Sequence, residues 1–586
     1  MKLIGQYIKK YGKLFTVGLC LKLLGSVLEL LIPYVMEHII DTVALTKDLK
    51  MVLAWGAGMI ALAVATWRIN LKANNKAIRM ASRAAYDIRQ ALFVKTIGLS
   101  GDQFDDFSLP SLTSRMTSDS YNVQNFLRAV QTMGVRAPIM LIGGIIITLT
   151  MDVGLAMILC VLAPIMIVII VTISRMGVPL YDKVQDKLDR IIRIMRENIT
   201  GIRVVKSLSK EEYEKRRYNE ANEDMTKADR KASIIMALPG PLMTLALNIG
   251  LTLVVIIGAK RVNAGVTEPG VILAFLTYFN MIMMGVMGLN RIFMMLSKAS
   301  ASADRISAVI NVPEDLIPVP EEQLPAAPSD DYIVFDGVTF GYGDDDDDDD
   351  DERFDGEERQ DSLVDISFSI PRGGSLGIIG ATGSGKTTVI NLLMRFYDTD
   401  SGHIFVDGRD VRTYVPDELR KKFGVVFQND LVFAMSLADN IAFGRNVDLE
   451  GIARAAREAQ ASDFIEEYED SYDHMSEIRG ANFSGGQKQR ILIARALAAD
   501  PDILILDDAS SALDYRTDAE LRKAIREDHG NATTIIIAQR ISSIMSLDRI
   551  LMLDDGKILG YGTHEELLEN CPQYLDIFKT QMGGEE

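Results

Sequence analysis

The chain has 586 residues, which is too long for one compact domain, and a formal net charge of −18, which argues against nucleic acid as a partner. Its mean hydropathy of +0.13 is high for a chain in which 24% of the residues are charged, so apolar and charged residues are expected in different halves. The three cysteines lie far apart in the sequence and indicate neither a disulfide framework nor a metal site.

The first 300 residues contain six long apolar segments. A helix that crosses a bilayer needs about 20 mostly apolar residues. The segments cover residues 14–36, 51–67, 137–151, 153–173, 232–259 and 269–290. Little more than Asp152 separates the third from the fourth, which predicts a tight hairpin. A soluble six-helix bundle is the alternative, but uncharged runs of 21 to 28 residues favour membrane spans.

The connections between the segments differ in charge. Residues 68–136 contain ten Lys or Arg and residues 175–231 contain fifteen, whereas the opposite connections hold two, none and two. Because basic loops stay on the cytoplasmic side, the two large connections are expected there. Apolar residues at helical spacing in 183–205 predict that the helices continue beyond the membrane.

Glu29 lies inside the first apolar segment. A carboxylate in a span often faces a substrate or a wet cavity. The alternatives are a position near one membrane face or an ion pair with another helix.

A phosphate-binding loop stands out in the second half of the chain. The apolar strand 375–379 runs into the sequence GATGSGKT at 380–387, and an apolar helix follows at 388–396. This context of strand, glycine-rich loop and helix is the one in which backbone N–H groups bind phosphate oxygens. The spacing predicts that Lys386 reaches the terminal phosphates and that the Thr387 hydroxyl ligates Mg²⁺. The expected contacts to ATP from this loop are Gly380, Thr382, Gly383, Ser384, Gly385, Lys386, Thr387 and Thr388.

Two further patterns accompany the loop. The apolar strand 503–506 ends in Asp507 and Asp508, and ligands bind at the carboxyl ends of strands in such sheets, so Asp507 is expected to hold Mg²⁺. The sequence FSGGQ at 483–487 opens an apolar helix with small residues and indicates a second anion site. Its expected contact residues are Ser484, Gly485, Gly486 and Gln487.

Taken together, these motifs resemble those of an ABC exporter half-transporter, and the resemblance covers essentially the whole chain. It implies an all-α transmembrane six-helix domain of the type I/IV exporter class at 1–310, a linker at 311–330, and an α/β P-loop NTPase domain at 331–582. It further implies that Tyr342 stacks on adenine, that Gln428 serves catalysis and Mg²⁺, and that Asp514 belongs to a loop that contacts a second nucleotide-binding domain. Two such domains would enclose two ATP molecules, each site combining the P-loop of one with the signature loop of the other. Short helices near 107–114 and 207–214 would pass motion between the two halves of the chain.

The sequence departs from this family at two catalytic positions. Asp508 stands where the family has a glutamate base, and Gln539 stands where it has a histidine. The carboxylate of Asp508 is one methylene short, which can cost on the order of 10²-fold in rate, and Gln539 cannot take up a proton. One interpretation is neutral drift, or an enzyme that tolerates Asp and Gln at these positions; a homodimer would then have two impaired sites. The other is a heterodimer, in which a second half-transporter supplies the glutamate and histidine.

Residues 344–361 hold thirteen acids against two arginines and so carry −11 of the net charge. Such a run cannot bury a core and predicts a disordered surface insertion. A divalent-cation site is a weaker alternative. We also hypothesise that this charge weakens ATP binding at low salt.

The sequence therefore predicts a subunit of an ATP-driven exporter in a bacterial cell membrane, with its ATPase domain in the cytoplasm, ATP and Mg²⁺ as cofactors, and amphipathic drugs, lipids or peptides as substrates. A regulator that gates another protein is the alternative from a different class. An importer and a DNA-repair ATPase are disfavoured.

Overall fold

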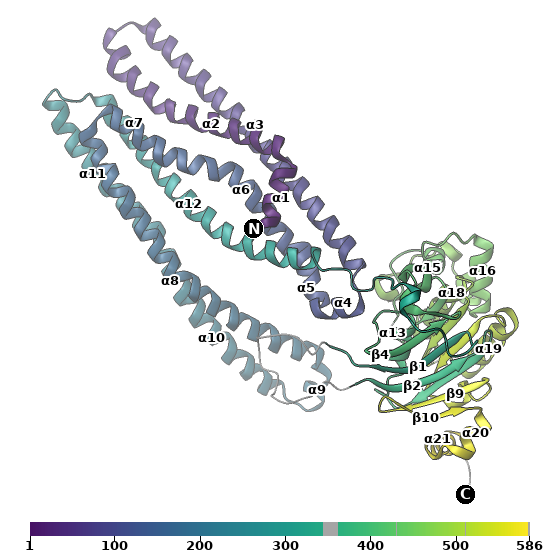
Figure 1. The fold of residues 1–586 in the computed structure, drawn as a ribbon. Helices are drawn as coiled ribbons and strands as arrows, with labels where there is room; N and C mark the ends of the chain where they lie inside the picture. Colours follow the sequence, from purple (N-terminus) through teal and green to yellow (C-terminus); the bar gives the residue numbers. More distant parts are fainter. Residues whose placement is uncertain (344–360, 429, 510, 584–586) are drawn as a thin grey trace. The chain divides into compact units, whose positions relative to one another are not determined.

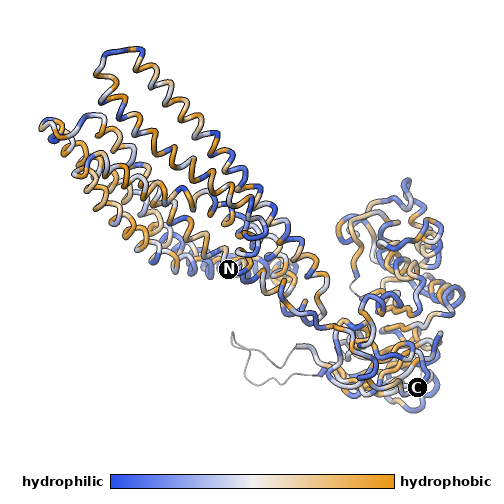
Figure 2. Tube along the Cα trace, turned by 45° about the horizontal axis from the view of Figure 1, so that its top comes forward, coloured by the Kyte–Doolittle hydropathy of each residue, from blue (hydrophilic) through white to orange (hydrophobic). Residues whose placement is uncertain are grey.

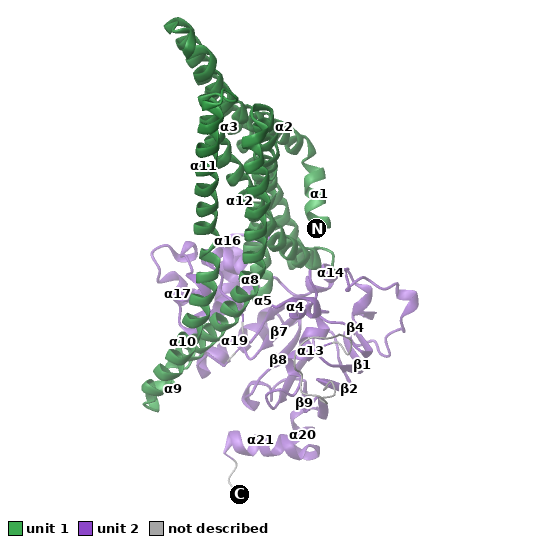
Figure 3. Cartoon of the chain, turned by 90° about the vertical axis from the view of Figure 1, so that its left-hand side faces the viewer, with its two compact units in different colours: residues 1–97, 109–312 green, residues 98–108, 313–586 purple. Residues whose placement is uncertain are grey.

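The computed structural model describes residues 1–343, 361–428, 430–509 and 511–583. The chain forms two compact units (Figure 3), the first from Met1–Ile97 and Leu109–Val312, the second from Gly98–Ser108 and Pro313–Glu586. The second unit is therefore built from two separate stretches of sequence. The acidic insertion expected at 344–361 lies outside the described residues except for Asp361.

Within the described residues, six helical stretches of the first unit are long and apolar enough to cross a membrane, as the sequence predicts. They are Gly12–Thr46, Leu49–Ile97, Leu109–Met151, Val153–Thr200, Glu211–Asn263 and Pro269–Ile310. Figure 2 shows apolar residues along these long helices. Most of the stretches have more than 40 residues, about twice what a bilayer core requires, so they extend well beyond it, as expected for the two basic connections.

The elements of this unit follow the chain in order (Figure 1). The α-helices are α1 (Lys2–Lys10), α2 (Gly12–His38), α3 (Leu49–Ile97), α5 (Leu109–Ser114), α6 (Ser120–Pro138), α7 (Gly144–Met151), α8 (Val153–Thr200), α9 (Ile202–Ser207), α10 (Glu211–Ala237), α11 (Pro239–Asn263) and α12 (Pro269–Ile310). Short turns of other helix types, at Ile39–Val43, Ala44–Thr46, Arg115–Asp119 and Ile139–Gly143, continue the spans.

The predicted hairpin between the third and fourth spans is confirmed. Asp152 alone separates α7 from α8, with an extended backbone at φ −154°. Its carboxylate accepts a hydrogen bond from the backbone N–H of Leu155 at 3.1 Å, which caps the start of α8. The same carboxylate forms an ion pair with Arg261 at 3.0 Å, so it ties this hairpin to α11.

Glu29 pairs with another helix, which is one of the alternatives left open by the sequence. Arg136 of α6 donates to Glu29 of α2 at 2.7 Å. About two turns before Glu29, the buried Lys22 donates from its ammonium to Asn70 of α3 at 2.8 Å. These contacts join three spans through polar groups, which are costly in a membrane unless they are paired.

The second unit contains two sheets. The four-stranded antiparallel sheet has the order β2-β1-β4-β5, and the six-stranded sheet has the order β10-β9-β3-β8-β7-β6, parallel except for β10. The strands are β1 (Ile333–Phe340), β2 (Leu363–Ile370), β3 (Ser375–Gly380), β4 (Ser401–Val406), β5 (Arg409–Asp410), β6 (Phe423–Val426), β7 (Ile503–Asp507), β8 (Thr533–Ile537), β9 (Arg549–Asp554) and β10 (Lys557–Gly562).

The parallel sheet forms the core of this unit and positions the site. Every residue of β7 and β8 is buried, as expected for strands covered on both faces. Because β3 and β7 are both neighbours of β8, their carboxyl ends meet at one edge. The helices are α4 (Gly101–Phe107), α13 (Lys386–Leu393), α14 (Pro416–Arg420), α15 (Leu437–Ala442), α16 (Leu449–Glu458), α17 (Ser462–Glu466), α18 (Gly485–Leu497), α19 (Tyr515–Asp528), α20 (His564–Asn570) and α21 (Pro572–Met582).

Candidate nucleotide-binding site

The phosphate-binding loop connects β3 to α13, as the sequence predicts. Two glycines within it, Gly383 and Gly385, have φ of +85° and +92°, which side chains other than glycine rarely adopt. A Cβ on Gly385 would lie 2.5 Å from the side chain of Leu363. Glycine is therefore required at this position for two reasons: the backbone has a positive φ, and there is no space for a side chain.

Lys386 is the first residue of α13, and its side chain reaches back to the start of the loop. Its ammonium donates to the carbonyl oxygens of Gly380 at 3.0 Å and Ala381 at 2.5 Å. Burial lowers the pKa of Lys386, while the charges of Asp507 and Asp508 act in the opposite direction. Carbonyl oxygens of the loop thus hold the ammonium in place. Phosphate oxygens of a bound nucleotide could replace them and would form stronger hydrogen bonds, because they are negatively charged.

Thr387 and Asp507 form the pair expected for magnesium. The Thr387 hydroxyl donates to Asp507 Oδ2 at 3.1 Å, and Asp507 is only 2% exposed. Burial raises the pKa of Asp507, and the neighbouring charge of Asp508 raises it further. A divalent cation here would compensate two adjacent carboxylates, and hydroxyl and carboxylate oxygens are the ligands that Mg²⁺ prefers. The residues present therefore fit the ion.

A cavity of about 610 Å³ surrounds the loop, a size typical of small-molecule sites. It brings together most of the residues predicted to contact ATP and Mg²⁺. These are Tyr342, Gly380, Thr382, Gly383, Gly385, Lys386, Thr387, Thr388, Gln428, Asp507, Asp508 and Gln539. Ser384 is buried beneath the loop, and Lys386 donates to its hydroxyl at 3.4 Å.

Seven residues that line the cavity were not predicted from the sequence. Four of them adjoin predicted residues in the chain, namely Ile379, Ala381, Ile537 and Ala538, and the other three come from elsewhere. Ser362 precedes β2, and Ile577 and Gln581 lie on the C-terminal helix α21. No motif marks these positions, because they reach the loop through tertiary packing from distant parts of the chain.

Tyr342 is held at one end of the cavity. Its hydroxyl donates to Thr388 at 3.2 Å and accepts from Asn391 at 3.2 Å. The edges of Phe340 and Tyr397 contact its ring, with centroid distances of 4.9 and 5.2 Å. The tyrosine remains 41% exposed, which leaves room for an adenine base against the ring.

The two residues expected to depart from the family pattern, Asp508 and Gln539, are in contact with one another. Gln539 Nε2 donates to Asp508 Oδ2 at 3.1 Å. Asp508 has φ of +49°, and its backbone N–H donates to Ile537 of β8 at 2.9 Å. Burial raises the pKa of Asp508, and Arg540 partly opposes this. The pair thus occupies the position where strands β7 and β8 end beside the P-loop.

The predicted signature loop lies at the start of α18. The hydroxyl of Ser484 accepts from the backbone N–H of Gln487 at 3.3 Å, and the Gln487 side chain accepts from the N–H of Ser484 at 2.9 Å. Phe483 is 6% exposed, and its ring packs against the aromatic rings of Phe464 and Tyr468.

Ser484, Gly485, Gly486, Gln487 and Asp514 are not among the described residues that line the cavity around the P-loop. Asp514 instead caps α19 by accepting from Thr517 at 2.9 Å. The fold of one chain therefore brings together the P-loop half of the predicted site and leaves the signature half apart from it.

The segment Gly98–Ser108 packs on the nucleotide-binding domain. The backbone N–H of Gly101 donates to Phe396 at 2.9 Å, and the Tyr397 hydroxyl donates to Asp105 at 2.8 Å. A Cβ on Gly101 would lie 2.3 Å from the Tyr397 ring, so only glycine permits this approach. The short helix that contacts the ATPase domain is thus α4, which lies earlier in the chain than the first range suggested by the family resemblance.

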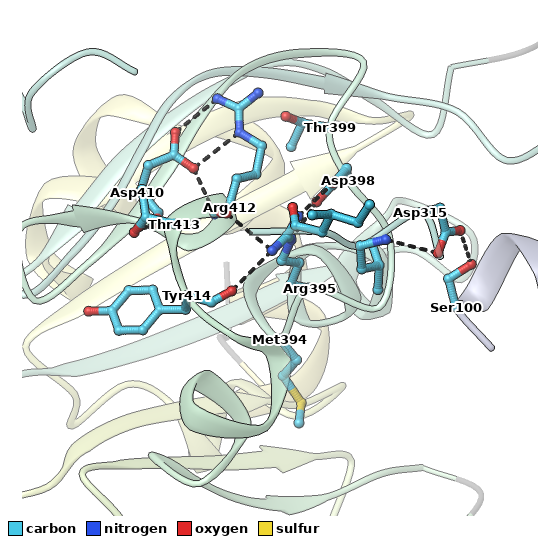
Figure 4. A network of polar contacts seen from close by, with 12 residues as sticks. Ser100, Asp315, Met394, Arg395, Asp398, Thr399, Asp410, Arg412, Thr413 and Tyr414 are labelled. Carbon is cyan, nitrogen blue, oxygen red and sulfur yellow. Dashed lines mark hydrogen bonds and ion pairs between the residues drawn. The ribbon is translucent and has the colours of Figure 1, made fainter. Parts of the chain in front are cut away.

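A second contact of this segment runs through the linker (Figure 4). The Ser100 hydroxyl donates to Asp315. The side-chain amide of Gln103 donates to the carbonyl of Pro313 at 2.9 Å. Close by, the fully buried Arg395 donates to the carbonyl of Ile317 at 3.1 Å and pairs with Asp398 at 2.8 Å. Residues 313–317 of the predicted linker are therefore fixed to the ATPase domain.

One chain thus joins membrane-spanning helices to an ATP-binding domain, which defines it as a membrane-bound ATPase. Residues 15–287 match the family model of the ABC transporter transmembrane region, and residues 363–511 match the ABC transporter family model. The chain belongs to the ABC transporters.

Two relatives agree with this membership, and a solved structure has a similar fold. The chain is 35% identical to the ABC transporter ATP-binding protein YfiB of Bacillus subtilis, over 99% of this chain and 98% of that protein. It is 32% identical to the ABC transporter ATP-binding protein MT1311 of Mycobacterium tuberculosis, over 99% and 98%. Its fold is similar to that of a bacterial Atm1-family ABC exporter solved with ATP bound, with a TM-score of 0.78, 24% identity and 99% of both chains covered.

Family membership establishes the general activity. The ABC ATPase domain binds ATP with Mg²⁺ and hydrolyses it in a reaction coupled to transport. The six apolar helices and the transmembrane family match make the chain a membrane protein of the exporter fold.

Proposed function

We propose that this chain is one of two different subunits of an ATP-driven exporter in a bacterial cell membrane. The observation that carries the proposal is the pair Asp508 and Gln539, which replaces a glutamate and a histidine while the ATP-binding residues around it keep the family pattern. The chain's own P-loop then forms a slow site that retains ATP. Bacterial origin is supported by relatives from Bacillus and Mycobacterium.

In this proposal the signature loop has a separate role. Ser484 and Gln487 form an intact helix start, and they lie apart from the cavity around this chain's P-loop. The loop would complete the ATP site of the second subunit, whose own glutamate and histidine would carry out fast hydrolysis. General loss of function would be expected to alter the signature loop as well as the catalytic positions.

The proposed transport cycle is alternating access. Closure of the two ATPase domains would open the cavity between the membrane-spanning helices outward, and hydrolysis would reset it. The substrate is an amphipathic compound such as a drug, a lipid or a peptide, handled within a cavity in contact with membrane lipid. In this proposal the ATPase domain lies in the cytoplasm. The strongly basic connections 68–136 and 175–231 are expected there, and the chain leaves the sixth span on the same side of the membrane.

The test is ATP hydrolysis by the chain in nanodiscs, alone and with the ABC half-transporter encoded next to it. We expect the pair to hydrolyse ATP and to be stimulated by amphipathic compounds, with the chain alone slower by about 10²-fold, as expected for displaced catalytic groups. Robust turnover by the chain alone would overturn the two-subunit proposal and favour a homodimer. Conductance or partner gating without transport would favour a regulator.

A matched pair of substitutions in this chain sharpens the test. Ser484→Ala should sharply lower hydrolysis by the two-subunit complex, because it removes a contact from the fast site. Asp508→Ala should leave most of that hydrolysis intact, because it alters only the slow site. The opposite order of effects would contradict the proposal.

A further inference from the structure

The C-terminal helix α21 reaches the loop that carries Gln539. Gln581 Nε2 donates to the carbonyl oxygen of Gln539 at 2.8 Å. The backbone N–H of Ile541 donates to Gln581 Oε1 at 2.8 Å. The side-chain amide of Gln581 thus bonds to the backbone on both sides of Arg540, donating to the residue before it and accepting from the residue after it.

This contact lies at the wall of the nucleotide site. Asp508, Gln539 and Gln581 all line the cavity of about 610 Å³ around the P-loop. The same three residues line an adjacent cavity of about 600 Å³. They therefore separate the two spaces, and movement of the loop would change the shape of both.

The first turn of α21 is anchored in the domain, and Gln581 lies near the other end of this helix. Tyr574 is fully buried, and its hydroxyl is hydrogen-bonded to His564 Nδ1 at 2.8 Å. By contrast, the 539–541 loop follows the end of β8 and is outside the strand ladder. Backbone groups beyond a ladder need other partners to hold one conformation.

We propose that Gln581 is a positioning residue of the ATP site. It holds the backbone of Gln539 so that the Gln539 side chain faces Asp508, and it thereby keeps this wall of the site closed around bound nucleotide. The proposal rests on ATP binding, which family membership establishes, and not on the two-subunit exporter.

Two measurements on the full-length chain in nanodiscs test it. Hydrogen–deuterium exchange of the nucleotide-free protein reports on the amide of Ile541. Release of the fluorescent analogue mant-ATP in the presence of Mg²⁺, chased with excess ATP, reports on retention of nucleotide. The variants are Gln581→Ala, Gln581→Glu, and the control Gln573→Ala on the same helix. The Gln573 side chain is exposed, and its contact is with Cys571 and not with the 539–541 loop.

Gln581→Ala should raise exchange in the peptide containing Ile541 at least 5-fold and speed mant-ATP release about 5-fold. Gln581→Glu keeps the acceptor for Ile541 but loses the donor to Gln539, so it should leave that exchange near the wild-type rate and still speed release. The control should change neither.

Unchanged exchange in Gln581→Ala would show that the contact does not hold the loop and would overturn the proposal. Raised exchange with unchanged release would equally overturn it, because the contact would then serve folding alone. Thermal unfolding of Gln581→Glu is the check on folding. One transition at the melting temperature of the wild type would show that the variant is folded, so that its release rate reports on the contact.

Discussion

Gln539 donates a hydrogen bond to Asp508 at 3.1 Å, so the two residues that we propose replace a catalytic histidine and glutamate are direct partners. The contact uses an amide donor that stays neutral at every pH. It holds Asp508 beside the P-loop while offering no group that can exchange a proton. The two replacements therefore act as one unit, and their effects should not add.

Restoration of the family residues is the first prediction. Asp508→Glu alone should give little gain in ATP hydrolysis by this site, since the longer carboxylate must displace Gln539. Asp508→Glu combined with Gln539→His should raise phosphate release by about 10²-fold, the cost assigned to the displaced catalytic group. A strong increase in ATP hydrolysis in Asp508→Glu alone would show that Gln539 does not limit the hydrolysis rate.

Lys386 is predicted to carry much of the ATP affinity. Lys386→Ala removes the charged donor that reaches the loop and should weaken binding of mant-ATP by 10-fold or more, in line with about 1.5–3 kcal/mol for a charged hydrogen bond. Lys421→Ala, at an exposed lysine after α14, is the matched control. Equal affinity of the two variants for mant-ATP would show that Lys386 does not bind the phosphates.

A buried ion pair in the ATPase domain predicts a pH-dependent stability. Asp410 is almost fully buried, and Arg412 donates to it at 2.8 Å. Burial alone would raise the pKa of Asp410, but the hydrogen bonds from Arg412 and His403 outweigh it and hold that pKa below its ordinary value. This carboxyl thus contributes stability above the unfolded-state pKa of about 3.9, and the contribution is lost as the pH falls through the lowered folded-state pKa.

Arg412→Gln should therefore destabilise the protein by about 3 kcal/mol at pH 7, because it leaves a buried carboxylate without its charged partner. The gap in melting temperature between the variant and the wild type should narrow as the pH is lowered toward 4, where the unpaired carboxyl takes up a proton. Arg516→Gln, which removes an exposed ion pair with Glu520, is the control and should change stability little. If the difference in melting temperature between Arg412→Gln and the wild type did not change with pH, Asp410 would not be the group responsible.

The pair of Glu29 and Arg136 predicts coupling between two spans. Glu29→Gln should destabilise the membrane-spanning unit by roughly 2 kcal/mol, less than a fully buried pair because Arg136 is 42% exposed. The double change Glu29→Gln and Arg136→Gln should recover part of that loss, as thermal unfolding in nanodiscs can measure. Additive losses would favour the interpretation in which Glu29 faces substrate.

Local patterns identified much of this protein from the sequence. The P-loop, the strand that ends at Asp507, and the six spans each depend on residues close together in the chain, where backbone conformation and apolar length decide the structure. The phosphate-binding residues, the Thr387–Asp507 pair and the Asp152 hairpin are in contact in the way such local rules predict.

Contacts between distant segments were beyond local rules. Asp105 meets Tyr397, Glu29 meets Arg136, and Gln581 meets the Gln539 loop across 292, 107 and 42 positions of sequence. Each depends on how two preformed elements pack, and a single polar side chain on an exposed helix face gives no sign of its partner.

The sequence by itself determined that the chain spans a membrane and binds ATP, because helix length, apolar composition and a contiguous loop carry that information. Only the tertiary structure decided which groups surround the nucleotide, that α4 belongs with the ATPase domain, and that Asp508 and Gln539 touch. Those features arise from side-chain packing between segments that are remote in the chain, which no local pattern encodes.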